Sequence, residues 1–272
     1  MEYYNKCKSN PKVSETMIEE VIRIGCATII FSIAAVMDWK TREINPHIWL
    51  PLLLTGISLG VFRSLNGLTV YQIISLVVSV IVVCIIAVLT FLPKLMGGAD
   101  FLAIASFTAL YPYTLPSTTF SYQMHTPNFN IIAYLLNFAM ILPPILTVLL
   151  IYTLIMLLFL IHNILHNLKY VDFLKNLAIP LHRKIYFILF HRIVNIGTIF
   201  KKRFYYPIFI PGYVERSGFD IYEDDLEWRK KLQGMPWEVT IVASWGIPMV
   251  TFFSISTLIY IALYLITLLY GG

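Results

Sequence analysis

Two aspartates lie at the ends of apolar segments that otherwise carry almost no charge. Asp38 stands in IAAVMDWKTREINPHIW, and Asp100 stands in KLMGGADFLAIASF. An ionisable side chain in a membrane segment is costly, and so by default it indicates a function. Two carboxyl groups that share one proton can hydrolyse a peptide bond, because the ionised group activates a water molecule while the protonated group donates to the scissile carbonyl. The sequence therefore suggests an intramembrane aspartyl dyad, with no fixed acid or base assigned to either residue.

Each of these features also has a plainer interpretation. Asp38 is compatible with a helix-end carboxylate that pairs with Lys40 or Arg42 in the headgroup region. Asp100 would suit the N-cap of the helix that follows it. Gly97 and Gly98 would either form a tight turn or let the backbone pass close to an extended substrate. Capping and catalysis do not exclude each other, so both interpretations stay open for Asp100.

The composition of the 272-residue chain is that of a membrane protein. It is 58% hydrophobic and 13% charged, whereas soluble domains are about a quarter charged. The net charge of +5 is compatible with nucleic-acid binding, but the basic residues alternate with apolar segments, so we expect no nucleic-acid partner. The three cysteines form no CxxC pair. His162 and His166 have no third ligand nearby, so we expect neither a metal nor a cofactor.

Six segments approach the roughly 17–25 apolar residues that a transmembrane helix needs. They cover residues 20–38, 47–63, 70–92, 100–116, 131–162 and 238–269. The first lacks a cleavage site and is expected to be retained as a span, and Pro143 with Pro144 predicts a kink in the fifth. Because lipid offers no partner to free backbone groups, spanning segments are helical. The sequence therefore predicts an all-α bundle of six transmembrane helices with an insertion between helices five and six.

The distribution of basic residues indicates which side of the membrane each loop faces. Twelve Lys or Arg lie in the insertion over 163–237, and others lie in 39–46, whereas the loops 64–69 and 117–130 hold none. By the positive-inside rule the insertion and both aspartates face the cytoplasm. Antiparallel packing of the first and fourth spans would then bring the two carboxyl groups together.

The insertion is expected to follow the membrane surface. Its segment KIYFILFHRIVNIGTIFKKRF predicts one basic amphipathic helix that lies in the interface. The alternative, a seventh span, would place Arg192 in the middle of the membrane. We therefore divide the chain into a five-span catalytic bundle over 1–162, the insertion over 163–237 and a sixth span over 238–272.

The chain resembles the type IV prepilin peptidase and preflagellin peptidase family of archaea and bacteria in two segments, DWKTREINPHIW and MGGADFLAIASFTALYP. This family belongs to the GxGD intramembrane aspartyl proteases. The resemblance implies that Asp38 and Asp100 are the catalytic pair and that Gly97, Gly98 and Ala99 are supporting motif positions. Ala99 departs from the motif, which has glycine there. The resemblance is carried mostly by the first four spans. With no CxxC pair for the zinc-binding domain of the bifunctional bacterial enzymes, the chain looks more like the archaeal branch, and N-methylation is not expected.

The resemblance also implies a substrate. Prepilins and preflagellins carry a short basic leader ahead of an apolar helix and are cut at the cytoplasmic membrane face. Acidic residues near the dyad would bind that leader; these are Glu43, Asp220, Glu223, Asp224, Asp225 and Glu227. The alternative is that this acidic run only neutralises nearby Lys and Arg. The expected partners are such precursors and membrane lipids, and the oligomeric state is left open.

Two other classes of function compete with the peptidase. One is a proton- or cation-coupled transporter that uses the two aspartates as a relay, but a relay belongs near the membrane midplane and the sequence has no inverted repeats. The other is a non-catalytic platform for a secretion or filament machine. The sequence contains neither HExxH nor GxSxG, so zinc and serine intramembrane proteases fit poorly.

Overall fold

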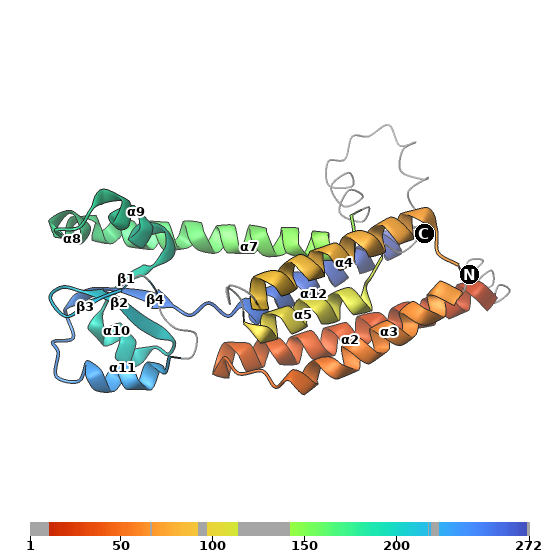
Figure 1. Cartoon of the computed structure of the whole chain (residues 1–272), viewed down its shortest axis with the longest axis horizontal. Helices are drawn as coiled ribbons and strands as arrows, with labels where there is room; N and C mark the ends of the chain where they lie inside the picture. The colour runs from red at the N-terminus through yellow and green to blue at the C-terminus, as the bar shows by residue number, and fades with distance from the viewer. Residues whose placement is uncertain are drawn as a thin grey trace. The chain divides into compact units, whose positions relative to one another are not determined.

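The structure is a computed structural model that describes residues 11–65, 67–91, 97–113, 142–216, 218 and 223–270. It separates into two compact units (Figure 1). The first unit contains the chain up to Thr153 and from Pro248 onward, and the second contains Leu154–Ile247.

The first unit is helical. Its elements are α2 (Pro11–Thr41), η1 (Pro46–Trp49), α3 (Leu50–Leu65), α4 (Val70–Phe91), α5 (Gly98–Leu110), the start of α7 (Pro144–Asn167) and α12 (Met249–Tyr270). Five segments of the described chain are helical, long and apolar enough to cross a membrane: Ile18–Thr41, Pro46–Leu65, Val70–Phe91, Pro144–Asn176 and Met249–Thr267. The prediction of several apolar spans is therefore confirmed, in agreement with a multi-pass membrane protein.

The predicted number of six spans is not confirmed. The helix α5 has 13 residues, which is about 20 Å at 1.5 Å per residue, and a bilayer core is about 30 Å thick. The fifth segment is helical from Pro144, where proline suits a first helical position, and it continues beyond residue 162 to Asn167. The part of that segment over 131–141 lies outside the described residues.

The membrane bundle packs around a cluster of aromatic rings. Phe31 of α2 contacts Trp49, Phe107 of α5 and Phe253 of α12, with ring centroids 5.5, 6.3 and 6.0 Å apart. All four side chains are buried. The helices α3 and α5 approach closely at Gly56, where a Cβ atom would lie 2.5 Å from the backbone of Ala109. Small residues allow such close approach between membrane helices, and this contact fixes α5 against α3.

The second unit contains a four-stranded antiparallel sheet of order β1-β4-β2-β3 (Figure 1). The strands are β1 (Arg192–Asn195), β2 (Tyr205–Ile210), β3 (Val214–Glu215) and β4 (Thr240–Trp245). The helical elements are the end of α7, η3 (Leu168–Tyr170), α8 (Val171–Asn176), α9 (Leu181–Phe190), α10 (Ile196–Lys201) and α11 (Asp225–Lys231). The prediction of an all-α chain is therefore wrong.

Two earlier predictions fail at this sheet, and for the same reason. The segment predicted as one interfacial amphipathic helix contains α9, β1 and α10, and the segment predicted as the start of the last span forms β4. Both faces of the sheet are covered, because Ile193 packs in one apolar cluster and its neighbour Val194 packs in the other. A strand buried on both faces is a continuous apolar run that periodicity cannot distinguish from a helix. The last helix begins only after Gly246 and Pro248, at Met249.

The end of α7 is attached to the edge strand of the sheet by side-chain amides. Asn163 and Asn167 both donate to the carbonyl of His191, at 2.8 and 2.7 Å. The Asn167 Oδ1 atom accepts from the Ile193 amide at 3.0 Å, and the His166 ring donates to the Ile193 carbonyl at 3.1 Å. These polar residues give α7 a fixed attachment to β1 within the second unit.

Candidate active site

Asp38 lies near the end of α2 and contacts the beginning of α12. The side chain is buried, with 7% of its surface exposed. Its Oδ2 atom accepts a hydrogen bond from the Thr251 amide at 2.8 Å and lies 3.0 Å from the Thr251 hydroxyl. The first amides of a helix have no partner within the helix and carry its partial positive charge. Asp38 therefore occupies the anion-binding end of α12.

Asp100 lies in the first turn of α5, three residues after the N-cap residue Gly97. Its Oδ2 atom accepts a hydrogen bond from the Gly97 amide at 3.1 Å. The capping interpretation therefore holds in a modified form, since the carboxyl binds the amide of the N-cap residue instead of being the N-cap itself. A Cβ atom on Gly97 would lie 3.1 Å from Oδ2 of Asp100, so glycine leaves room for the carboxyl. Ala99 packs against the apolar core, and a Cβ atom on Gly98 would meet no atom within 4 Å.

The fold brings the two aspartates together. Although they are far apart in the sequence, their carboxyl groups lie close enough to interact electrostatically. Tyr152 of α7 interacts electrostatically with both, and its ring lies 6.5 Å from that of Phe253. Within the described residues no Lys or Arg lies at ion-pair distance from either carboxyl. Two interacting carboxyl groups, one buried and one half-buried, without a counter-ion favour a state in which the pair holds one proton.

Among the described residues, one oxygen of each carboxyl accepts hydrogen bonds and the other has no partner. All the hydrogen bonds from described residues go to Oδ2, from Thr251 to Asp38 and from Gly97 to Asp100. Both Oδ1 atoms therefore remain available to bind water or a substrate carbonyl. Such an arrangement suits general acid–base chemistry on a peptide bond.

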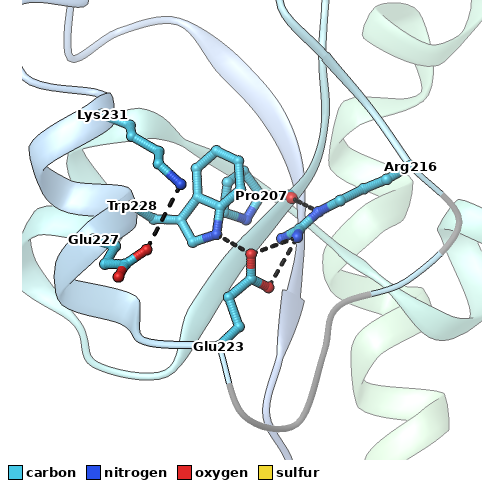
Figure 2. Close-up of polar contacts among 6 residues, drawn as sticks. All are labelled: Pro207, Arg216, Glu223, Glu227, Trp228 and Lys231. Atoms are coloured by element: carbon cyan, nitrogen blue, oxygen red, sulfur yellow. Dashed lines mark hydrogen bonds and ion pairs between the residues drawn. The ribbon is translucent and has the colours of Figure 1, made fainter.

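The acidic residues proposed to bind a leader lie in both units. Glu43 is exposed in the loop after α2, in the same unit as the aspartates. Glu223 belongs to the second unit, where both of its oxygens accept from Arg216, at 2.7 and 2.8 Å, and Oε1 also accepts from the Trp228 indole (Figure 2). Arg216 in turn donates to the Pro207 carbonyl at 2.6 Å, so this cluster joins α11 to strand β2.

The other acidic residues of the second unit have more local contacts. Asp224 is the N-cap of α11 and accepts from the Leu226 amide at 2.9 Å. Glu227 lies 3.7 Å from Lys231, both exposed. Asp220 and the side chain of Asp225 lie outside the described residues. The contacts of Glu223 and Glu227 agree with the alternative in which the run balances nearby cations, while the exposed Asp224 and Glu227 remain accessible to a ligand.

Thr251 and Tyr152 are the residues at this site that the sequence interpretation missed. A threonine in the first turn of a helix that follows Gly-Ile-Pro is a common pattern, and nothing in the sequence relates it to Asp38, 213 positions earlier. Tyr152 lies in the long apolar helix α7, where nothing in the sequence distinguishes it from its neighbours. Pro248, which marks the start of α12, was the available signal for a free set of amides at this place.

The comparison with protein families agrees with this geometry. The model of the type IV leader peptidase family matches residues 26–161, half of the chain. The matched region contains both aspartates and the GGAD sequence, and it ends before α12 and before the sheet. A search among curated proteins found no significant match. The chain belongs to the type IV leader peptidase family.

Proposed function

We propose that this protein is a membrane aspartyl endopeptidase that removes the short basic leader from prepilin- or preflagellin-like precursors at the cytoplasmic face of the cell membrane. The observation that carries the proposal is the pair of Asp38 and Asp100. They lie on different helices, interact electrostatically and have no neighbouring cation in the described part of the chain. Their place inside the matched family region supports the assignment.

The proposed reaction needs one proton shared between the two carboxyl groups. The ionised aspartate takes a proton from water, and the resulting hydroxide oxygen bonds to the scissile carbonyl carbon. The protonated aspartate gives its proton to the carbonyl oxygen, which forms a neutral tetrahedral intermediate. The C–N bond then breaks as one aspartate gives the proton taken from water to the nitrogen and the other, now ionised, takes a proton from one hydroxyl of the intermediate. The amine leaves, the carboxylic acid forms, and the dyad again holds one proton. The free Oδ1 atoms are suited to these transfers because no described residue binds them.

Binding of the leader by acidic residues is part of this proposal. Glu43, Asp224 and Glu227 are exposed and would attract a basic segment. Glu223 would contribute less, since its charge is already paired with Arg216. The Lys and Arg content of the insertion supports the cytoplasmic location, and the family match favours the peptidase over a transporter or an assembly platform.

The test is leader cleavage in membranes that contain the enzyme and a precursor. Asp38→Asn and Asp100→Asn keep the shape of each side chain but cannot share a proton, so each variant should lose cleavage at least ~10³-fold. Asp172→Asn is the matched control, because Asp172 is exposed and lies 3.1 Å from Lys175 in the second unit. Protein levels are measured in parallel. Full cleavage by either dyad variant would reject the proposal.

A further inference from the structure

Thr251 offers two donors to a single oxygen of Asp38. Its amide lies 2.8 Å and its hydroxyl 3.0 Å from Oδ2. Both residues are buried, with 6% and 7% of their surfaces exposed. A carboxyl oxygen held by two donors has a fixed position, which fixes the direction of Oδ1 as well.

The hydroxyl of Thr251 also lies 3.0 Å from the carbonyl oxygen of Ala35 on α2. A hydroxyl has one hydrogen, so it donates either to Asp38 or to Ala35. Donation to Oδ2 is stronger while Asp38 is ionised, because hydrogen bonds to a charged acceptor are about twice as strong as neutral ones. Once Oδ1 has taken a proton, Oδ2 becomes a weaker acceptor, and the hydroxyl can turn to Ala35 without leaving a buried donor unpaired.

We propose that Thr251 is a positioning residue of the dyad: it holds Oδ2 of Asp38 while its hydroxyl changes partner as Asp38 gains and loses a proton, and it leaves Oδ1 as the reactive oxygen. The inference rests on the proposed peptidase function and deepens it. It also gives α12, which lies outside the matched family region, a role in the reaction.

The test compares Thr251→Val with Thr251→Ser. Valine has the shape of threonine and keeps the backbone amide, but it loses the hydroxyl, whereas serine keeps the hydroxyl. We expect the valine variant to lower kcat by ~10- to 100-fold, which is the effect expected on the rate when one hydrogen bond to a charged group is lost. KM should stay within about twofold, because Thr251 faces Asp38 and not the substrate. The serine variant should restore kcat to within about threefold of the wild-type value.

Thr257→Val is the matched control. Thr257 lies on the same helix and is fully buried, and its hydroxyl has no hydrogen-bond partner among the described residues. Its loss should leave kcat unchanged. All rates are divided by the amount of folded enzyme, and thermal midpoints are recorded for each variant. If the valine variant does not fold, Thr251→Ala is compared with Thr251→Ser in the same way.

Two results would overturn the inference alone: a valine variant as fast as the wild-type enzyme, or a serine variant as slow as the valine variant. In both cases the wild-type enzyme would still cleave and the dyad variants would not. Absence of cleavage by the wild-type protein would instead overturn the proposed function, and the role of Thr251 with it.

Discussion

The α2 helix holds buried ionisable side chains near its C-terminal end and near its middle, but their charges are balanced in different ways. Near the C-terminal end, Asp38 faces Asp100, and the described residues provide no cation at ion-pair distance. Fifteen residues earlier, Arg23 pairs with Glu19, with 2.6 Å between Nη2 and Oε1. Arg23 is 1% exposed and also donates to the carbonyl oxygen of Leu110, at the end of α5.

The difference separates buried charges that hold the bundle together from the aspartate pair, which we propose to be catalytic. The Arg23 pair supplies each charge with an opposite one and ties α2 to the C-terminal end of α5. Asp38 ties α2 to the N-terminal end of α12, while the two aspartates interact with each other without a cation at ion-pair distance among the described residues. Such a pair costs stability and indicates a function. The predictions below test whether the Arg23–Glu19 pair and the aspartate pair differ in this way.

The largest effect is expected at the dyad, where activity and stability should separate. Asp38→Asn and Asp100→Asn should abolish cleavage, yet the thermal midpoint of each variant in detergent should equal or exceed that of the wild-type protein, because neither variant has to hold two acidic side chains near each other without a cation. Thermal unfolding of the purified proteins checks this. A large loss of stability in both variants would place the aspartates among the structural charges.

Arg23→Met should have the opposite effect. It leaves Glu19 buried without its cation, which costs about 3–5 kcal/mol when one partner of a buried pair is removed. Cleavage per folded molecule should stay close to the wild-type value. The double variant Glu19→Gln/Arg23→Met should recover most of the stability, since no unpaired charge remains. A stable but inactive Arg23→Met protein would contradict the distinction between the Arg23–Glu19 pair and the aspartate pair.

His191 extends the comparison to a buried ionisable group in the second unit. Burial lowers the pKa of His191 from 6.5 to about 4, so the folded protein keeps the ring neutral where the unfolded chain already takes up a proton. Below pH ~6.5 the unfolded state therefore binds more protons, and the unfolding free energy of this unit should fall as the pH falls toward 4. Hydrogen exchange of the backbone amides of β1 and β4 across this pH range measures this change in unfolding free energy. His191→Phe should flatten this pH dependence, whereas replacement of the exposed His182 should not.

The smallest effect is expected from the acidic run of the second unit. Charge reversal at Glu223, Asp224 and Asp225 should slow cleavage of a basic-leader precursor a few-fold, as expected for long-range attraction that is screened by solvent. It should slow a precursor with neutralised leader lysines less. Competition assays with the two precursors measure the ratio of their cleavage rates in the wild-type and the variant enzyme. Equal slowing of both would assign these residues, like Glu19, to charge balance within the fold.

The sequence was sufficient to single out Asp38 and Asp100 as candidates and to predict several apolar spans, because a charged residue in an apolar segment stands out locally. Asp38, Asp100 and the glycines before Asp100 needed no knowledge of the fold. Thr251 could not be found in this way, since its role depends on α12 beginning beside Asp38. The sheet was missed because Ile193, Val194 and their neighbours in β4 are buried on both faces and resemble a membrane segment. The partner of Glu223 was also invisible, because Arg216 reaches it only in the folded unit.

The short length of α5 has a consequence for both ends of this helix. A helix of about 20 Å that crosses a bilayer perpendicular to its plane cannot place both of its ends in water, because the hydrocarbon core is about 30 Å thick. The unpaired backbone amides or carbonyls at a helix end would then lie in the hydrocarbon core, where lipid offers them no hydrogen-bond partner. The Asp100 carboxyl serves one end and the Arg23 guanidinium serves the other. The short length of α5 thus gives the Asp100 carboxyl at one end and the Arg23 cation at the other the same task, since each binds a backbone group that lipid could not.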